Sequence, residues 1–335
     1  MVKRVFYIVL CCCMMSCMSR VEEEYADTPE GNFEALWEII DTKYCFMEEK
    51  KVDWNDIYNE YLPKVQRLAD NDVYGLFDLL ASMLDSLQDG HVNLYSPFDV
   101  SHCTSWREGY PTNYDASLLY SDKYLSTDYR TAGGLIYQRI DDGRVGLIRY
   151  SSFSDSFSAQ NMAYVLHYFK DCQGLIIDVR SNGGGSLEYA RKLAATFFSE
   201  TRTVGYQQHK TGSGHTDFSD LQAVTVDTLD MAVRWLRPVA VLSNRSAYSA
   251  TNFFISAMRY ADNALIVGGK SGGGGGMPMS YELPNGWIVR FSSVRMYDRD
   301  KQLIEEGIEP DREVTLTSED KDDIIEAAID WIETK

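Results

Sequence analysis

Residues 175–187 read Leu-Ile-Ile-Asp-Val-Arg-Ser-Asn-Gly-Gly-Gly-Ser-Leu. The apolar run Leu175–Val179 predicts a buried strand, and three successive glycines separate it from a helix that begins near Leu187. Consecutive glycines let backbone N–H groups approach a ligand closely and form an anion-binding nest, although they equally suit a plain tight turn. The loop has neither the Gly-x-Gly-x-x-Gly spacing nor a Gly-Lys-Ser/Thr sequence, which argues against a nucleotide site.

A second strand, turn and helix follows at residues 239–259. Val239–Leu242 predicts a strand, Ser243–Tyr248 is a polar turn, and an apolar helical stripe follows Ser249. This arrangement exposes a nucleophile, and Ser249 at the helix start would lie beside free backbone N–H groups that stabilise negative charge. Ser249 alone is equally well explained as a helix N-cap, so both interpretations stay open.

Short apolar runs alternate with helical periods from Gly143 onward, which is typical of an α/β fold. The predicted strands are Val145–Arg149, Leu175–Val179, Val239–Leu242, Ala264–Val267 and Trp287–Phe291, and the predicted helices are Ser158–Phe169, Leu187–Phe198 and Ser249–Arg259. Residues 95–142 and 203–230 are polar without a clear period, which predicts loops, hairpins or lids. The Gly272–Gly276 run predicts a flexible loop.

Upstream of this core the pattern is helical. Apolar residues recur at helical spacing in Phe33–Tyr44, Trp54–Ala69 and Tyr74–Leu87. The sequence therefore predicts an N-terminal helical lobe over residues 33–94, followed by an α/β domain over residues 95–335.

The first 32 residues predict export and anchoring. Lys3-Arg4 precedes the apolar run Val5–Met15, which is too short to span a membrane, and Ser16-Cys17 resembles a bacterial lipobox. We therefore expect a lipoprotein signal peptide over residues 1–17, lipidation of Cys17, and an acidic tether over residues 18–32. The expected location is the cell envelope, lipid-anchored on the periplasmic side or the cell surface.

Composition excludes several classes of protein. The 335-residue chain is 44% hydrophobic, which is enough for a full core, and its net charge of −18 makes a nucleic-acid partner implausible. After cleavage of the predicted signal peptide, the mature chain would keep Cys17, Cys45, Cys103 and Cys172. The spacing of these cysteines matches no zinc-binding pattern. We expect no metal and no cofactor.

Two further segments contain residues that could act in acid–base catalysis. Asp89-Gly90-His91 follows the third predicted helix, and a lone histidine after a helix end is more often structural than catalytic. Residues 305–311 read Glu-Glu-Gly-Ile-Glu-Pro-Asp, which alone indicates a solvated acidic turn.

The order of these features resembles that of the tail-specific, or C-terminal processing, serine protease family. Along the chain they are a helical lobe, Asp-Gly-His, Asp-Val-Arg-Ser-Asn-Gly-Gly-Gly, Ser-Ala-Tyr-Ser-Ala-Thr, a glycine-rich loop and Gly-Ile-Glu-Pro-Asp. The resemblance covers roughly residues 33–315. It implies an α/β spiral fold related to Clp protease and crotonase. It also implies that Ser249 is the nucleophile and that backbone N–H groups of Gly183, Gly184 and Ala250 form the oxyanion hole.

The general base is where this chain departs from the best-known branch of the family. That branch pairs its serine with a lysine, and the equivalent position here is Gly274, with Lys270 four residues earlier. Another branch, which includes tricorn, uses the histidine of the Asp-Gly-His segment, oriented by a glutamate near Gly-Ile-x-Pro-Asp. His91 and Glu305 occupy those places, with Glu306 as the rival of Glu305. A histidine base of ordinary basicity predicts activity that rises through an apparent pKa of about 6 to 7.

A PDZ module, which many relatives carry, has no room here. Only 50 residues lie between Leu94 and Val145, and they contain no Gly-Leu-Gly-Phe-like loop. We therefore expect a serine-type endopeptidase that cleaves a peptide or protein substrate without reading its C-terminus through such a module. The alternative is a lipoprotein that binds a peptide or small ligand on the same fold without cleaving it. The missing lysine supports that alternative, as does Asn252, which stands where many relatives carry glutamate.

Overall fold

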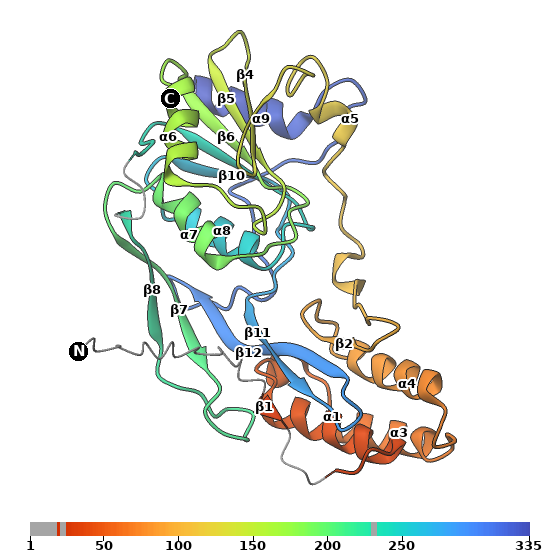
Figure 1. Ribbon diagram of the computed structural model, residues 1–335. Helices are drawn as coiled ribbons and strands as arrows, with labels where there is room; N and C mark the ends of the chain where they lie inside the picture. Colours follow the sequence, from red (N-terminus) through yellow and green to blue (C-terminus); the bar gives the residue numbers. More distant parts are fainter. Residues whose placement is uncertain (1–18, 21–24, 229–232) are drawn as a thin grey trace, which may run out of the picture.

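The computed structural model describes residues 19–20, 25–228 and 233–335 (Figure 1). A seven-stranded sheet forms the centre of the α/β part, and its strand order is β13-β10-β9-β6-β5-β4-β3. The strands are β3 Arg130–Ala132, β4 Leu135–Ile140, β5 Val145–Tyr150, β6 Gly174–Asp178, β9 Val239–Ser243, β10 Ala264–Gly268 and β13 Arg312–Glu313. Strands β5, β6, β9, β10 and β13 run parallel, which explains why β5, β6 and β9 are buried along their whole length.

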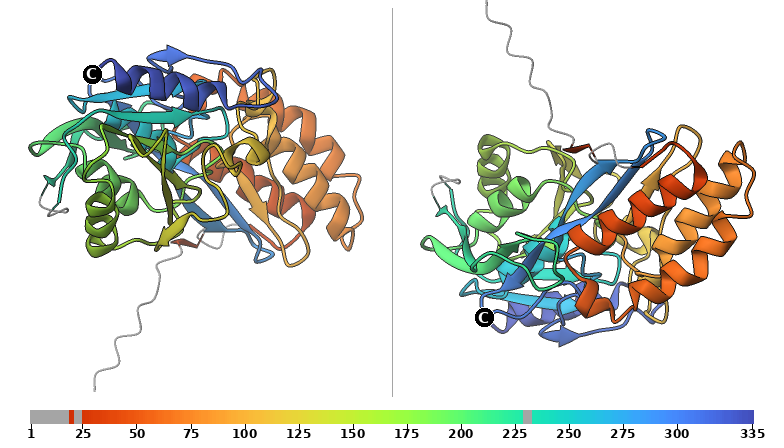
Figure 2. Two further views of the ribbon diagram at one scale, coloured as in Figure 1. Left: turned by 90° about the horizontal axis from the view of Figure 1, so that it is seen from above. Right: turned by 90° about the horizontal axis from the view of Figure 1, so that it is seen from below.

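Helices cover both faces of this sheet. Helices α6 Ala159–Tyr168, α7 Leu187–Ala195 and α8 Ala250–Met258 lie on one face, and α9 Asp323–Glu333 lies on the other (Figure 2). Each face of the sheet has its own hydrophobic core, one shared with α6, α7 and α8 and the other shared with α9. Side chains alternate across a strand, so Leu175 and Ile177 of β6 pack in the first core and Ile176 packs in the second.

A second sheet of six strands lies beneath the first in Figure 1. Its order is β1-β11-β12-β7-β8, and β2 also pairs with β12. The strands are β1 Ser19–Arg20, β2 Asn93–Tyr95, β7 Arg202–His209, β8 Gln222–Val226, β11 Gly276–Glu282 and β12 Ile288–Asp298. The hairpin of β11 and β12 therefore joins the C-terminal part of the chain to the segment that follows Asp89-Gly90-His91.

The N-terminal helices share their core with that hairpin. Helices α1 Pro29–Lys43, α2 Met47–Lys50, α3 Trp54–Val65 and α4 Val73–Asp85 bury their apolar faces against Leu283, Trp287, Val289 and Phe291. The predicted lobe over residues 33–94 is thus helical up to Asp85, but it has no separate core and it ends in a strand of the second sheet. Helix α1 also begins inside the predicted tether, because Thr28 caps it through a bond from the Gly31 amide.

Every predicted strand and helix of the α/β part is present, with shifts at their ends. Residues 95–142 and 203–230 do contain hairpins, formed by β3 with β4 and by β7 with β8. The expectation of a flexible Gly272–Gly276 loop is wrong, because all five glycines are buried and Cβ atoms at their positions would clash with neighbouring atoms. The predicted signal peptide, with Cys17, lies outside the described residues. Within the described part of the chain, no helix is long and apolar enough to cross a membrane.

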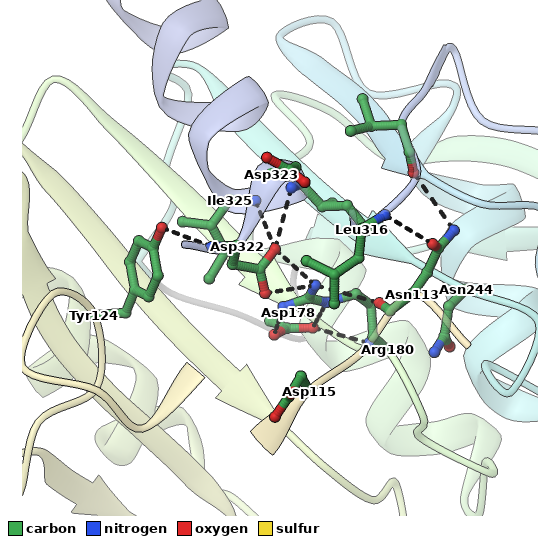
Figure 3. Close-up of polar contacts among 12 residues, drawn as sticks. Asn113, Asp115, Tyr124, Asp178, Arg180, Asn244, Leu316, Asp322, Asp323 and Ile325 are labelled. Atoms are coloured by element: carbon green, nitrogen blue, oxygen red, sulfur yellow. Dashed lines mark hydrogen bonds and ion pairs between the residues drawn. The ribbon is translucent and has the colours of Figure 1, made fainter. Parts of the chain in front are cut away.

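A buried ion network fixes the start of the glycine turn (Figure 3). The fully buried guanidinium of Arg180 pairs with Asp178 at the end of β6 and with Asp322 at the start of α9, each at 2.8 Å. Arg180 and Arg149 hold the pKa of Asp178 below its usual range against the opposing effect of burial. The network ties the end of β6 to the start of α9 directly before residues 183–185.

Candidate active site

Ser249 lies at the junction of a turn and helix α8. Its backbone has φ 60° and ψ −121°, a left-handed conformation that is costly for a residue with a side chain. Its amide donates to the Gly273 carbonyl at 2.9 Å, and its side chain makes no capping hydrogen bond to the helix. The hydroxyl of Ser249 is therefore free for another partner, which the N-cap interpretation would not allow.

That partner is His91. The two segments are 158 residues apart in the chain, and Nε2 of His91 lies 3.0 Å from Oγ of Ser249. His91 is buried, and burial lowers its pKa to about 4, with smaller lowering effects from Arg290 and Lys50 and a raising effect from Asp89. The imidazole is therefore neutral at neutral pH and can accept the hydroxyl proton.

Asp89 fixes the backbone of His91 rather than its ring. One carboxylate oxygen of Asp89 accepts from the His91 amide at 2.7 Å and from the Tyr248 hydroxyl at 3.3 Å, and the other accepts from the Tyr44 hydroxyl at 2.8 Å. The Tyr248 ring packs against the imidazole, with 4.9 Å between the ring centroids. Although burial opposes ionisation of Asp89, the charge of Lys50 and these donors keep its pKa low. Sequence reasoning placed Asp89 in a motif but gave it no role.

The other ring nitrogen of His91 faces a serine. Oγ of Ser292, a buried residue of β12, lies 3.4 Å from Nδ1. If Nδ1 carries the proton and donates to this hydroxyl, Nε2 is left with the lone pair that Ser249 requires. We assign this tautomer from the hydrogen-bond network. Ser292 was not predicted from the sequence, because 201 residues separate it from His91 and no motif surrounds it.

Glu305 was predicted to orient His91, and the structure pairs it with other groups. One carboxylate oxygen accepts from Nζ of Lys50 at 3.0 Å, and the other accepts from the Gly275 amide at 2.8 Å. Burial and the charge of Asp89 raise the pKa of Glu305 to about 8. Its rival Glu306 is exposed, and its backbone carbonyl accepts from Arg245 at 3.0 Å. Neither glutamate makes a hydrogen bond to the His91 ring within the described chain.

The predicted oxyanion donors surround Ser249 but are not equivalent. Ala250 is the first residue of α8, so its amide has no acceptor within the helix. Gly183 lines the cavity beside Ser249, and a Cβ there would meet no atom within 4 Å. The Gly184 amide instead donates to Oδ1 of Asn182 at 2.9 Å. Gly183 and Ala250 thus line the cavity, whereas the Gly184 amide is engaged within the turn.

Gly184 is required for a different reason. Its φ is +101°, and a Cβ on it would lie 2.8 Å from Cβ of Ser249 and 3.0 Å from the Ala250 amide nitrogen. The first contact is shorter than real Cβ atoms show, and the second is tighter than nine in ten real Cβ contacts. Only glycine therefore lets the turn approach the candidate nucleophile this closely.

No lysine reaches Ser249 in the described structure. Lys270 forms an ion pair with Glu309 at 2.9 Å. Gly274, where the resemblance would place the family lysine, has φ +72°, and a Cβ there would lie 2.5 Å from the Tyr248 ring. The glycine run is thus packed against the site and leaves no space for a side chain.

The side chain of Asn252 forms hydrogen bonds to two loops near the site. Its side-chain nitrogen donates to the Ile304 carbonyl at 2.8 Å, and its oxygen accepts from the Ser271 hydroxyl at 2.6 Å. Both groups of this buried amide are satisfied, so Asn252 holds the loops around the site together. The lack of a glutamate at this position does not remove a group from the Ser249–His91 pair.

A cavity of about 450 Å³ opens at Ser249 and His91. Its apolar side chains come from helices α7 and α8, strands β11 and β12, and the loop before Glu305; they are Leu187, Phe253, Met277, Pro278, Met296 and Ile304. In the described part of the chain, no cluster of His, Cys, Asp and Glu could hold a metal ion. The arrangement is a serine hydroxyl beside a neutral histidine ring, with an adjoining cavity.

Two segments of the chain match known protein families. Residues 144–314 match peptidase family S41, and residues 25–85 match the tricorn protease C1 domain. Among curated proteins, a probable CtpA-like serine protease of Staphylococcus saprophyticus is 25% identical over 177 residues. That match covers 51% of this chain and 34% of the relative, so the chain spans about a third of the length of the curated relatives it matches.

Solved structures resemble nearly the whole chain. A "putative peptidase" from Parabacteroides merdae is 46% identical, covers 91% of this chain and 96% of its own, and has a TM-score of 0.85. Mature CPAF, at 13% identity, covers 91% of this chain and 95% of its own with a TM-score of 0.63, which shows a shared fold. The predicted α/β fold, related to Clp protease and crotonase, is confirmed. The chain belongs to peptidase family S41.

Proposed function

We propose that this protein is a serine endopeptidase that hydrolyses peptide bonds by acyl transfer to Ser249, with His91 as the general base. The observation that carries the proposal is the 3.0 Å contact between Oγ of Ser249 and Nε2 of a neutral, buried His91. Membership of peptidase family S41 supports the same chemistry. Substrates are peptides or proteins.

In the acylation step, Nε2 of His91 takes the proton of Ser249 while Oγ attacks the carbonyl carbon of the peptide bond. The carbonyl oxygen becomes an oxyanion beside the Ala250 amide and the Gly183 turn. The imidazolium then gives its proton to the departing amine, and the C–N bond breaks to leave an ester on Ser249. In deacylation, His91 takes a proton from water, which attacks the ester, and then returns it to Oγ as the acid product leaves.

The imidazolium in this mechanism is stabilised without a carboxylate on its ring. Nδ1 faces the neutral hydroxyl of Ser292, and Asp89, which bonds to the His91 amide, supplies the nearby negative charge. This charge raises the pKa of His91, although burial outweighs it. The sequence-based role of Glu305 is therefore replaced by Ser292 as the group that orients the ring.

Labelling with a fluorophosphonate tests the proposal, because only an activated serine reacts with it. We expect the wild-type protein to be labelled and to cleave peptides, and Ser249→Ala and His91→Ala each to lose nearly all of both activities. The double variant should lose little more, because members of one catalytic unit are not additive. Lys270→Ala is the matched control and should retain activity, since Lys270 is engaged with Glu309.

Two results would contradict this assignment. If Lys270→Ala is inactive while His91→Ala is active, the base is the lysine. If the folded wild-type protein binds peptides but is never labelled at Ser249, the alternative of a binding protein on this fold replaces the peptidase.

We also propose that the protein is anchored to the cell envelope by a lipid on Cys17. Support comes from the sequence alone: Lys3-Arg4, the apolar run Val5–Met15 and the lipobox-like Ser16-Cys17. These residues lie outside the part of the chain that the structure describes.

A further inference from the structure

The cavity at Ser249 contains a cation that has no partner of opposite charge among the described residues. Arg290 of β12 lines the cavity, and among the described residues that line it there is no aspartate or glutamate. This contrasts with the chain as a whole, whose net charge is −18. The catalytic cavity is therefore a local positive site in an acidic protein.

The strand β12 places Arg290 next to the reacting groups. Arg290 and Ser292 are two residues apart, so their side chains leave the same face of the strand. Oγ of Ser292 contacts the His91 ring, and Nη1 of Arg290 lies 3.5 Å from the His91 carbonyl and 3.3 Å from Oδ1 of Asn93. One strand thus presents an orienting hydroxyl and a guanidinium to the same histidine.

The contacts of Arg290 leave most of its hydrogen-bonding capacity unused. A guanidinium has five N–H donors, and the two acceptors near Arg290 are neutral and at long distance. Arg290 takes part in no ion pair among the described residues, whereas Arg295 on the same strand pairs with Glu49 at 2.8 Å. Arg290 is only half-buried and lines the cavity, so part of the residue is open to it.

We infer that Arg290 forms a substrate subsite for a carboxylate that lies close to the scissile bond. A guanidinium fork matches a carboxylate in two parallel hydrogen bonds, and the apolar walls of the cavity strengthen such a pair relative to water. The carboxylate comes from one of two sources: the C-terminus of a peptide or the side chain of an aspartate or glutamate. The inference rests on the proposed peptidase function and adds a substrate preference to it.

Arg290 could also act only through His91, since its charge lowers the pKa of that imidazole. Such an effect would change the rate for every substrate equally. A carboxylate subsite instead changes the ratio between substrates that differ in one charge. The test therefore compares matched peptides.

Two pairs of fluorogenic peptides separate the sources of the carboxylate. One pair differs only in a free or amidated C-terminus, and the other, amidated throughout, has glutamate or glutamine beside the cleavage site. We expect the wild-type enzyme to prefer the carboxylate member of one pair by about 10- to 100-fold in kcat/KM, as for a charge-assisted hydrogen bond. The pair that shows the preference identifies the source.

Variants then assign the preference to Arg290. Arg290→Gln should remove it, and Arg290→Lys, which keeps the charge but not the fork, should retain a reduced preference. The control is Arg299→Gln, which removes one exposed positive charge just beyond the end of β12 and should leave the preference unchanged. A circular dichroism spectrum checks that each variant is folded.

The inference is overturned if the wild-type enzyme cleaves both members of each pair equally, or if Arg290→Gln keeps the preference. Peptide binding to Ser249→Ala, measured by fluorescence anisotropy, separates this failure from failure of the proposed function. If no peptide is cleaved but Ser249→Ala prefers a carboxylate and the Ser249→Ala, Arg290→Gln double variant does not, the subsite stands without the peptidase. If that preference is absent as well, the subsite is rejected.

Discussion

The hydroxyl of Ser292 lies 3.4 Å from Nδ1 of His91, on the side of the ring opposite Ser249. A neutral group therefore occupies the place where a histidine base commonly has a carboxylate. A hydroxyl can fix the tautomer and the direction of the ring, but it adds no negative charge to stabilise the imidazolium. This difference affects both the rate of the reaction and its dependence on pH.

Replacing Ser292 with alanine should lower kcat about 2- to 10-fold with little change in KM. The lost interaction is one hydrogen bond between neutral groups, worth about 0.5 to 1.5 kcal/mol. Steady-state kinetics on a peptide substrate measures the effect. Ser293→Ala changes the next residue of β12 and should behave as wild type; equal kinetics for both variants would show that Ser292 does not orient the ring.

Acylation of Ser249 should be independent of pH between about 5.5 and 8. His91 acts as a base only when unprotonated, and because burial lowers its pKa to about 4, it is unprotonated throughout this range. The rate constant of fluorophosphonate labelling measures this, with circular dichroism to confirm the fold at each pH. A rate that rises through about pH 6.5, as expected from the sequence alone, would mean that the imidazole is solvated or paired with a carboxylate.

The same shift in the pKa of His91 affects stability. The unfolded chain takes up a proton at about pH 6.5, whereas the folded chain does so only at about pH 4. The contribution of His91 to stability is therefore complete above about pH 6.5 and is lost as the pH falls toward 4. Denaturant unfolding at pH 7.5 and 5 compares wild type with His91→Ala: the wild type should lose more stability on going to pH 5, whereas the effect of Glu305, whose pKa is raised to about 8, is common to both proteins.

Gly184→Ala should abolish labelling of Ser249, whereas Gly183→Ala should not. A Cβ on Gly184 would lie 2.8 Å from Cβ of Ser249 in a backbone conformation that alanine rarely adopts, but a Cβ on Gly183 meets open space. The Cβ added at Gly184 would also lie 3.0 Å from the Ala250 amide nitrogen, and losing one such oxyanion donor costs about 100- to 1000-fold in kcat. Labelling with a small fluorophosphonate compares the two variants, and equal labelling would show that the approach of Gly184 to Ser249 is not needed.

Arg180→Met should destabilise the fold by about 3 to 5 kcal/mol, because it leaves the buried carboxylates of Asp178 and Asp322 without their cation. Urea unfolding gives the loss in free energy. Arg144→Met, which breaks only the exposed pairs with Asp141 and Glu333, should cost far less. Equal losses in the two variants would show that burial of the network is not what matters.

Cys17→Ser should move the protein from the membrane fraction to the soluble fraction without changing its circular dichroism spectrum, if Cys17 carries the lipid anchor. Cell fractionation followed by immunoblotting measures the change, with Cys45→Ser as a control for loss of a thiol. A wild-type chain that is recovered in the soluble fraction, with an N-terminus beyond residue 17, would refute the anchor.

The α/β fold could be predicted because its parallel strands are buried on both faces. Val239–Ser243 and Gly174–Asp178 therefore appear as continuous apolar runs that end in polar turns. Strands β7 and β8 are partly exposed, and their polar sequences gave no clear period. Helix α9 was missed although its signal is present: Asp322 caps it, and Ile324, Ala328 and Ile332 recur at helical spacing.

In the candidate site, the positions of Ser249 and His91 could be predicted from the order of motifs, but their surroundings could not. Ser292 reaches His91 through the hairpin of β11 and β12, and Lys50 takes the carboxylate of Glu305 across 255 residues of sequence. Such contacts depend on how the N-terminal helices pack on the second sheet. This packing cannot be predicted from a local sequence motif.

The glycine at position 274 and the ring of Tyr248 occupy neighbouring volumes, so a side chain at 274 and an aromatic ring at 248 exclude each other. A lysine introduced at position 274 would need both a strained backbone and the removal of Tyr248, which also packs on His91 and bonds to Asp89. A change of the proposed base from His91 to a lysine at position 274 would therefore need substitutions at both 274 and 248.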